Sequence, residues 1–514
     1  MNKYIVIISC LFFCFSAIAE TSETNSVQIE KTKYIGIYDT ENNQFIFRGI
    51  PYAKPPIGEL RWKSPVPLSK EPKVINAQSF KPACMQDEYT TVWYQDVAEL
   101  FGNPRTVFQH VDAVSEDCLY LNIWTNSLDQ TSKKPVMVWV HGGADTGGWS
   151  YEPNYLGHHL ASKDVVVVSI NYRLNIFGFF AHPQMSNQTG NFGLEDEILA
   201  LQWVKNHIAA FGGDPENITY FGESAGGAHV SYLIASPMGK GLFKRGIIQS
   251  GAYNLFNWTS KDKAEELGLK TQTILNASDL QTMKTLSAEN ILSASIDLNH
   301  PYGPNIDGAL IPNNLTKLFN EGSFNNVDLM IGSNKNEDYM YIDESVTEKD
   351  INRLIENYYP EYRDKILSWL DLEDPRLAMD HLTTNQVTLC PSVFIARSLS
   401  KNGNNVYQYH FTRMREGSEK ILSYHGAEIP YVFNTHDEWL PTNEDDTQLT
   451  EAMMEYWVEF AKKGTPNSIN NPTWKEFGTE ESYLILDLPL ESSAKLENEF
   501  CEIMIDEMLK RTSR

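Results

Sequence analysis

The sequence predicts an α/β fold, with a central, mainly parallel, twisted sheet and helices on both of its faces. Short runs rich in β-branched residues are apolar on both sides, which is typical of strands that are covered on both faces. Residues 194–211 carry apolar side chains at steps of three and four, which indicates one buried helical stripe. Strand and helix patterns alternate along the middle of the chain, and this alternation favours parallel strands. The predicted strands are residues 135–140, 164–172, 217–222, 243–251 and 327–333.

One edge of the sheet is predicted ahead of these strands. Residues 35–53, IGIYDTENNQFIFRGIPYA, have the pattern of a small antiparallel hairpin. No Gly/Ser/Pro-rich linker, repeat or long charge block interrupts the sequence. We therefore expect residues 20–514 to form a single domain.

The first residues predict a cleaved signal peptide, residues 1–19. Lys3 precedes an apolar run over residues 4–15, and Ala17 and Ala19 form the small-residue pattern of a cleavage site. The alternative, a membrane anchor, needs a longer apolar run. No later stretch is apolar for long enough to cross a bilayer, so we expect no stable membrane insertion and an exported protein, secreted or periplasmic.

The charge balance excludes one class of partner. The chain has 42 Lys and Arg residues against 67 Asp and Glu residues, a net charge of −25. A nucleic-acid-binding protein needs a basic face, so no nucleic-acid partner is expected. An acidic surface that favours solubility is the main interpretation, and steering of cationic substrates is the alternative.

The cysteines predict disulfides rather than a metal site. Four remain after the signal peptide, at Cys84, Cys118, Cys390 and Cys501, and an even number in an exported protein indicates two disulfides. Spacing alone leaves three pairings open. The sequence has no Cys/His cluster with zinc spacing and no glycine-rich phosphate loop, so neither a metal nor a cofactor is expected.

A serine follows the predicted strand 217–222 in the order Gly222, Glu223, Ser224, Ala225, Gly226, and a helical pattern continues after it. A serine at a sharp strand-to-helix turn has a strained backbone and an exposed Oγ, and its neighbours two positions away must be small. The helix also directs its first N–H groups toward that Oγ. This context predicts a nucleophile, whereas the five residues alone are equally consistent with a small-residue turn.

A second loop supports this prediction. Residues 141–148, HGGADTGG, follow the predicted strand 135–140 directly. Glycines let the backbone approach a substrate and direct N–H groups at a carbonyl oxygen. The loop lies past a strand end, at the same edge of the sheet as Ser224, which favours an oxyanion hole over a flexible turn.

Nine segments together resemble the type B carboxylesterase/cholinesterase family of α/β-hydrolases. They are residues 47–65, 115–124, 138–144, 171–180, 190–227, 242–251, 304–312, 332–337 and 425–433. The similarity extends from about residue 30 to about residue 500. It implies the α/β-hydrolase fold and an esterase that acts on small-molecule esters.

The resemblance implies a catalytic triad in the chain order serine, acid, histidine. His425 opens HGAEIPYVF, the segment similar to the family's catalytic-histidine loop, and its surroundings predict an exposed loop. Glu337 follows the predicted strand 327–333 where the family has its triad glutamate. Asp307, Asp338 and Asp343 are the rival acids; Asp307 is expected to organise a turn. Asp338 adds a like charge where the family usually has a small residue.

The same resemblance implies the supporting residues. Gly143, Ala144 and Ala225 would supply the oxyanion-hole N–H groups, while Glu223 and Ser250 occupy positions near the triad. It also implies that Cys84 pairs with Cys118 and that Cys390 pairs with Cys501. The first disulfide would close a loop on the entrance side of the site, and the second would tie a C-terminal helix, residues 496–510, to the body.

We therefore expect an exported serine carboxylesterase that works through an acyl-enzyme. A catalytically silent binding protein of the same fold is one alternative. A choline-ester hydrolase is the other, and it requires a tryptophan ten residues before the cysteine of SEDC, where this sequence has Phe108.

Overall fold

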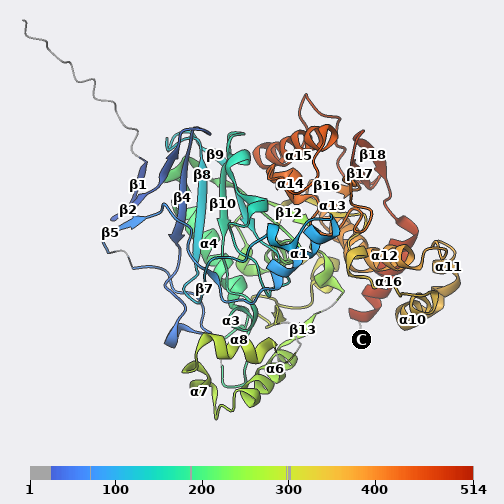
Figure 1. Ribbon diagram of the computed structural model, residues 1–514, viewed down its shortest axis with the longest axis horizontal. Coiled ribbons are helices and arrows are strands. Elements are labelled where there is room, and N and C mark those ends of the chain that lie inside the picture. Colours follow the sequence, from blue (N-terminus) through green and yellow to red (C-terminus); the bar gives the residue numbers. More distant parts are fainter. Residues whose placement is uncertain are drawn as a thin grey trace, which may run out of the picture.

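The computed structural model describes residues 25–69, 71–185, 188–256, 258–296, 298 and 302–512. The predicted signal peptide, residues 1–19, lies outside the described residues. A large twisted sheet runs through the middle of the molecule, with helices before and behind it (Figure 1).

The sheet has eleven strands among the described residues, and its central part is parallel. Every neighbouring pair is parallel along the order β10, β9, β11, β12, β15, β16, β17. This confirms the predicted fold class. The bounds are β9 Lys134–Val140, β10 Val166–Ile170, β11 Gly213–Glu223, β12 Arg245–Gln249, β15 Asp328–Asn334, β16 Val406–Phe411 and β17 Ser482–Leu486.

The edges of the sheet are antiparallel. β3 (Ile37–Asp39) and β4 (Gln44–Pro51) form the hairpin predicted over residues 35–53, and β4 pairs with β8 (Tyr120–Thr125). β18 (Glu491–Ala494) closes the opposite edge against β17. The parallel strands that carry the loops of interest therefore lie away from both edges.

The central strands are buried on both faces, as their apolar runs predict. Along β9, Val136, Val138 and Val140 pack into one core, while Met137 and Trp139 pack into the core on the other side. Side chains of α4 (Phe192–His207) and α5 (Ala225–Ala235) complete the first core. Those of α14 (Ile429–Phe433) and α15 (Glu444–Lys463) complete the second. This two-sided packing fixes the sheet as a rigid base for the loops at its carboxyl edge.

The stripe predicted over residues 194–211 is not a single α-helix. α4 covers Phe192–His207, and a 3-10 turn follows over Ile208–Phe211. The turn ends at Gly212, which has φ 79°, a conformation that favours glycine. The apolar stripe is continuous across the change because both parts pack into the same core.

Two disulfides tie outlying segments to this body. Cys84 is bonded to Cys118, and Cys390 to Cys501, which is the pairing that the resemblance implies. The first closes the segment that contains α1 (Tyr89–Leu100); the second joins α13 (Cys390–Lys401) to α16 (Asn498–Thr512). Among the described helices, none is both long and apolar enough to cross a bilayer.

Candidate active site

Ser224 lies between the end of β11 and the start of α5, and its backbone is strained. It has φ 55° and ψ −124°, a region that costs a non-glycine residue about 1–3 kcal/mol. Its N–H donates to the carbonyl of Gln249 at the end of β12, at 2.9 Å, which helps to hold the turn. A Cβ on Gly222 would lie 2.6 Å from the backbone of both Gly226 and Val140. The strand and the helix are therefore as close as the sequence pattern predicts.

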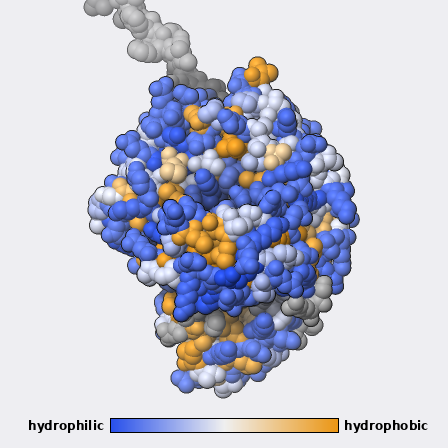
Figure 2. Space-filling model, turned by 90° about the vertical axis from the view of Figure 1, so that its right-hand side faces the viewer, coloured by the Kyte–Doolittle hydropathy of each residue, from blue (hydrophilic) through white to orange (hydrophobic). Residues whose placement is uncertain are grey.

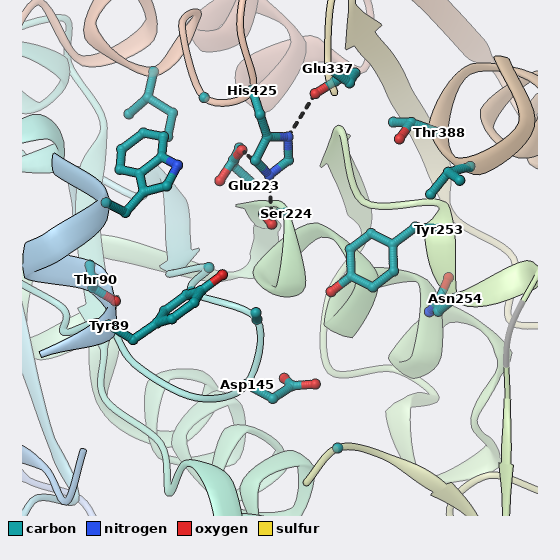
Figure 3. Close-up of a pocket in the computed structure, with 18 of the residues that line it drawn as sticks. Tyr89, Thr90, Asp145, Glu223, Ser224, Tyr253, Asn254, Glu337, Thr388 and His425 are labelled. Atoms are coloured by element: carbon teal, nitrogen blue, oxygen red, sulfur yellow. Dashed lines mark hydrogen bonds and ion pairs between the residues drawn. The ribbon is translucent and has the colours of Figure 1, made fainter. Parts of the chain in front are cut away.

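Ser224, His425 and Glu337 form a continuous hydrogen-bonded chain. The Ser224 Oγ lies 2.8 Å from His425 Nε2, and His425 Nδ1 lies 2.6 Å from Glu337 Oε2 (Figure 3). Glu337 follows β15, and His425 lies in the connection between β16 and α14. The fold thus brings together residues that are separated by 201 and 88 positions.

The loop around His425 is not exposed, contrary to the prediction. Its neighbours Tyr424 and Ala427 pack into the second core, and the His425 side chain keeps 21% of its surface exposed. The adjacent glycine marks a tight turn, since Gly426 has φ 82°. The imidazole is therefore held on a largely buried loop and keeps part of its surface accessible.

None of the rival acids takes the position of Glu337 beside His425 Nδ1. Asp307 accepts hydrogen bonds from the N–H groups of residues 309, 310 and 311, so it organises a turn as expected. Asp343 accepts from the N–H of Ser345 in an exposed turn. Asp338 borders the cavity, and its N–H donates to Asp380 at 3.1 Å. Burial raises the pKa of Asp338, and Glu337 raises it further. The raised pKa favours the neutral form of Asp338 and so reduces the like charge beside Glu337.

A second carboxylate, that of Glu223, faces His425. Its Oε1 lies 3.3 Å from His425 Nε2, on the side of the ring where Ser224 also lies. Burial raises the pKa of Glu223 to about 8. Burial lowers the pKa of His425, but Glu223 and Glu337 outweigh this and raise it. The two groups are thus electrostatically coupled beside the serine.

The predicted oxyanion loop borders Ser224. Gly142, Gly143 and Ala144 line the same cavity as the serine. The φ angles of Gly143 and Ala144 are 103° and 54°. Among the described residues, no acceptor faces their N–H groups, and Ala225 begins α5, where N–H groups have no intrahelical acceptor. These N–H groups are therefore free to bind a developing negative charge.

Ser250 is fully buried directly after β12, next to Gln249, whose carbonyl accepts the N–H of Ser224. The Ser250 N–H donates to the Gly332 carbonyl at 2.9 Å, and its hydroxyl has no hydrogen-bond partner among the described residues. Its neighbour Gln249 donates a side-chain N–H to Glu428 at 3.2 Å. The expectation that Ser250 lies near the triad stays a prediction.

A buried network that the sequence analysis missed supports Glu337. Asn334 donates its N–H to Glu337 Oε1 at 2.7 Å and its side-chain N–H to Glu428 at 2.7 Å. Glu428 follows His425 by three residues, and Asn334 ends β15, so the network connects the loop of Glu337 with the loop of His425. A polar residue at the end of an apolar strand is the signal that could have found Asn334.

The cavity above Ser224 has a volume of ≈ 680 Å³ and a largely aromatic lining. Tyr89 and Thr90 reach it from α1, and Tyr253, Asn254 and Thr388 face it from the other side (Figure 3). Phe108 does not line the cavity; the Phe108 ring stacks on the Tyr94 ring, with 4.1 Å between the ring centroids. The aromatic lining includes Tyr89, Trp93, Tyr94, Tyr253, Tyr302 and Tyr341. No pattern in the sequence marked these residues, because they come from segments far apart in the chain.

A parallel sheet with a strained serine between strand and helix, and an acid and a histidine on later loops, defines an α/β-hydrolase. Comparison with known proteins agrees. A sequence model of the carboxylesterase family matches residues 23–504. The chain belongs to this family.

Individual relatives support the same assignment. Mouse (Mus musculus) liver carboxylesterase 1 is 32% identical, with 94% of this chain and 92% of that protein covered. Mouse cholinesterase is also 32% identical, with 86% and 79% covered. Among solved structures, a protein named PNB esterase has a TM-score of 0.80 at 29% identity, covering 94% of this chain and 100% of its own. A Geobacillus stearothermophilus carboxylesterase has the same TM-score and identity, with 93% and 100% covered. The protein is a carboxylic-ester hydrolase.

Proposed function

We propose that this hydrolase is an exported serine carboxylesterase that cleaves small-molecule esters through an acyl-enzyme. Ser224 is the nucleophile, His425 the general base and acid, and Glu337 the residue that orients the imidazole. The observation that carries this proposal is the hydrogen-bonded chain from the Ser224 Oγ through His425 to Glu337, at 2.8 and 2.6 Å.

The reaction follows from these positions. His425 Nε2 takes the serine proton as Oγ attacks the ester carbonyl, and the imidazolium then gives that proton to the leaving alcohol. Water enters, loses a proton to His425 and attacks the acyl-enzyme, which releases the acid and restores Ser224. Glu337 accepts the Nδ1 hydrogen bond, so it fixes the tautomer and stabilises the imidazolium.

The negative oxygen formed in each attack needs hydrogen-bond donors. Gly143 and Ala144 border the same cavity as Ser224, and Ala225 follows Ser224 directly at the start of α5. Within the described part of the chain, the N–H groups of these three residues have no backbone acceptor. We assign the oxyanion hole to them. Loss of one such donor costs about 2.7–4 kcal/mol of transition-state stabilisation.

Export is part of the proposal. The predicted signal peptide and the two disulfides support it, because disulfides persist in oxidising compartments. Residues 20–514 would then be the mature chain and form one domain, since strands from β3 to β18 share one sheet. N-terminal sequencing of the exported protein is expected to begin at Glu20; a retained residue 1–19 segment contradicts cleavage.

The proposed function is tested by assaying wild type and Ser224→Ala on a panel of nitrophenyl esters with acyl chains of increasing length. Wild type is expected to hydrolyse the esters, and Ser224→Ala to lose about 10⁴-fold or more in kcat. Activity that survives in a folded Ser224→Ala variant would contradict the serine mechanism. Wild type without activity would favour the silent binding alternative.

A choline-ester preference is the second candidate. The indole of Trp93, from α1, lines the cavity, and its N–H donates to the Tyr341 hydroxyl at 2.7 Å. Phe108 does not line the cavity. An aromatic face in a cavity can hold a quaternary ammonium group. Adding choline esters to the panel distinguishes the two candidates. Faster hydrolysis of choline esters than of neutral esters of equal size supports the choline-ester preference. Faster hydrolysis of the neutral esters supports the general esterase.

A further inference from the structure

A buried ion cluster lies under the oxyanion loop, and the proposed proton transfers do not use it. We call His229, Asp145 and Glu197 the buried cluster. His229 Nδ1 lies 2.6 Å from Glu197 Oε1, and its Nε2 lies 2.8 Å from Asp145 Oδ1. The side chains of His229 and Glu197 are 1% and 0% exposed, and that of Asp145 is 13% exposed. Figure 3 shows Asp145 across the cavity from His425.

The cluster requires a charged histidine. Nδ1 is hydrogen-bonded to Glu197, and Nε2 lies within ion-pair distance of Asp145, so two nearby negative charges favour the ring with both of its protons. Burial lowers the pKa of His229, but Glu197 and Asp145 together raise it to about 10. The other oxygen of Glu197 accepts from the Tyr220 hydroxyl at 2.6 Å, which fixes this carboxylate. His229 therefore compensates two carboxylates that would otherwise be buried without a cation.

The cluster connects the two parts of the proposed oxyanion hole. His229 lies four residues after Ala225 on α5, and residues at this spacing share one face of a helix. Asp145 follows Ala144 directly in the loop after β9. The ion pair between His229 and Asp145 thus links α5, which carries the proposed oxyanion donor Ala225, to the loop after β9, which carries the other two proposed donors.

The loop needs such an anchor because its backbone is strained. Ala144 and Asp145 have φ 54° and 59°, where residues other than glycine are disfavoured. Asn175 holds the backbone by donating its N–H to the Asp145 carbonyl at 2.6 Å. His229 holds the side chain. Without the side-chain anchor, the loop can relax and turn the Ala144 N–H away from the oxyanion.

We propose that His229 is a positioning residue for ester hydrolysis, which holds the Gly143 and Ala144 N–H groups toward the oxyanion through its ion pair with Asp145. The inference rests on the proposed function, because it presupposes a tetrahedral oxyanion on Ser224. Glu197 serves to keep His229 charged and in place.

Kinetics of His229→Gln give the first test. We expect kcat to fall about 100-fold, comparable to the loss of one oxyanion donor, with KM within about threefold of wild type. The control is His182→Gln, at another buried histidine, which bonds Gln272 at 2.7 Å and does not line the cavity. This control is expected to keep kcat. If His229→Gln does not fold, Asp145→Asn replaces it, since it breaks the same contact and leaves the His229–Glu197 pair.

A transition-state analogue gives the readout that a merely structural role would not change. A trifluoromethyl ketone adds to Ser224 as a hemiketal, and NMR of a ¹³C-labelled carbonyl carbon reports the pKa of its oxygen. A 100-fold loss of oxyanion stabilisation corresponds to a rise of about two units in that pKa. We also expect Asp145→Asn/His229→Gln to recover part of the kcat lost in His229→Gln, because the loop then places no buried carboxylate against a neutral amide side chain.

The outcomes separate the two proposals. If folded His229→Gln keeps kcat within about threefold, or loses kcat while the hemiketal pKa is unchanged, the positioning role is wrong. If wild type forms no hemiketal and Ser224→Ala remains active, the proposed function itself fails. The inference is supported if His229→Gln has a raised hemiketal pKa and a reduced kcat while His182→Gln keeps the wild-type values of both.

Discussion

His425, the proposed general base, contacts two carboxylates that have different effects on its imidazole. Glu337 bonds Nδ1 at 2.6 Å and so leaves Nε2 free to accept the serine proton. Glu223 approaches Nε2 itself, at 3.3 Å, where its negative charge favours the protonated imidazole. Only the neutral imidazole can act as a base. Glu223 is therefore expected to shift the pH range in which the enzyme is active to higher values.

Glu223→Gln tests this effect. Since Glu223 raises the pKa of His425, the acid limb of kcat/KM is expected above the ordinary histidine value in wild type. The variant removes the charge and keeps the size, so the limb should move to lower pH by about one unit. Asp343→Asn, at an exposed acid, is the control and should leave the limb in place. A limb that stays or moves to higher pH in Glu223→Gln contradicts the coupling.

At the scale of elements, the crossing of β11 and α5 places Ser224. A Cβ on Gly222 would lie 2.6 Å from backbone atoms of Gly226 and Val140, which cannot move like the end of a side chain. The crossing therefore depends on glycine for space rather than for its backbone freedom.

Gly222→Ala is expected to lower the free energy of unfolding by about 3 kcal/mol and to reduce kcat, because the strand and the helix must separate beside Ser224. Urea unfolding and steady-state kinetics measure both. The matched control is Gly246→Ala in β12, where the new methyl group would meet only side chains, at 3.2 Å or more. Equal stability and activity in Gly222→Ala and wild type would show that the crossing tolerates a methyl group.

The elements that position Ser224 are predictable from the sequence because their signals are local. Apolar runs predict the strands, spacing by three and four predicts α4, and two glycines around Ser224 predict the tight turn. The buried cluster is not predictable in this way. Asp145, Glu197 and His229 each have an ordinary explanation alone, and only the packing of α4, α5 and the loop after β9 brings them together. The resemblance, rather than any local pattern, indicated Glu337 among four acids.

For the whole molecule, the two disulfides are expected to have different consequences. The segment closed by Cys84–Cys118 has a sequence separation of 34 and contains α1, which borders the cavity. The segment closed by Cys390–Cys501 has a separation of 111, and the bond holds α16 against α13. One disulfide therefore acts near the site and the other on the body of the fold.

Paired Cys→Ser variants separate these effects. Loss of Cys390–Cys501 should lower the free energy of unfolding by about 4–5 kcal/mol, since it closes the longer loop, and leave kcat unchanged. Loss of Cys84–Cys118 should cost about 3–4 kcal/mol and also change KM, because α1 gains freedom. Urea unfolding under non-reducing conditions and kinetics below the transition measure both. A KM change confined to the Cys390→Ser/Cys501→Ser variant would reverse this assignment.

Covalent labelling of Ser224 tests the central claim most directly. An organophosphate ester transfers its phosphoryl group to an activated serine, and peptide mass spectrometry locates the adduct. We expect an adduct on Ser224 whose yield follows the loss of esterase activity, and no such adduct in His425→Ala treated for the same time. Complete inhibition with Ser224 unmodified, or full modification of Ser224 with activity retained, would contradict the account.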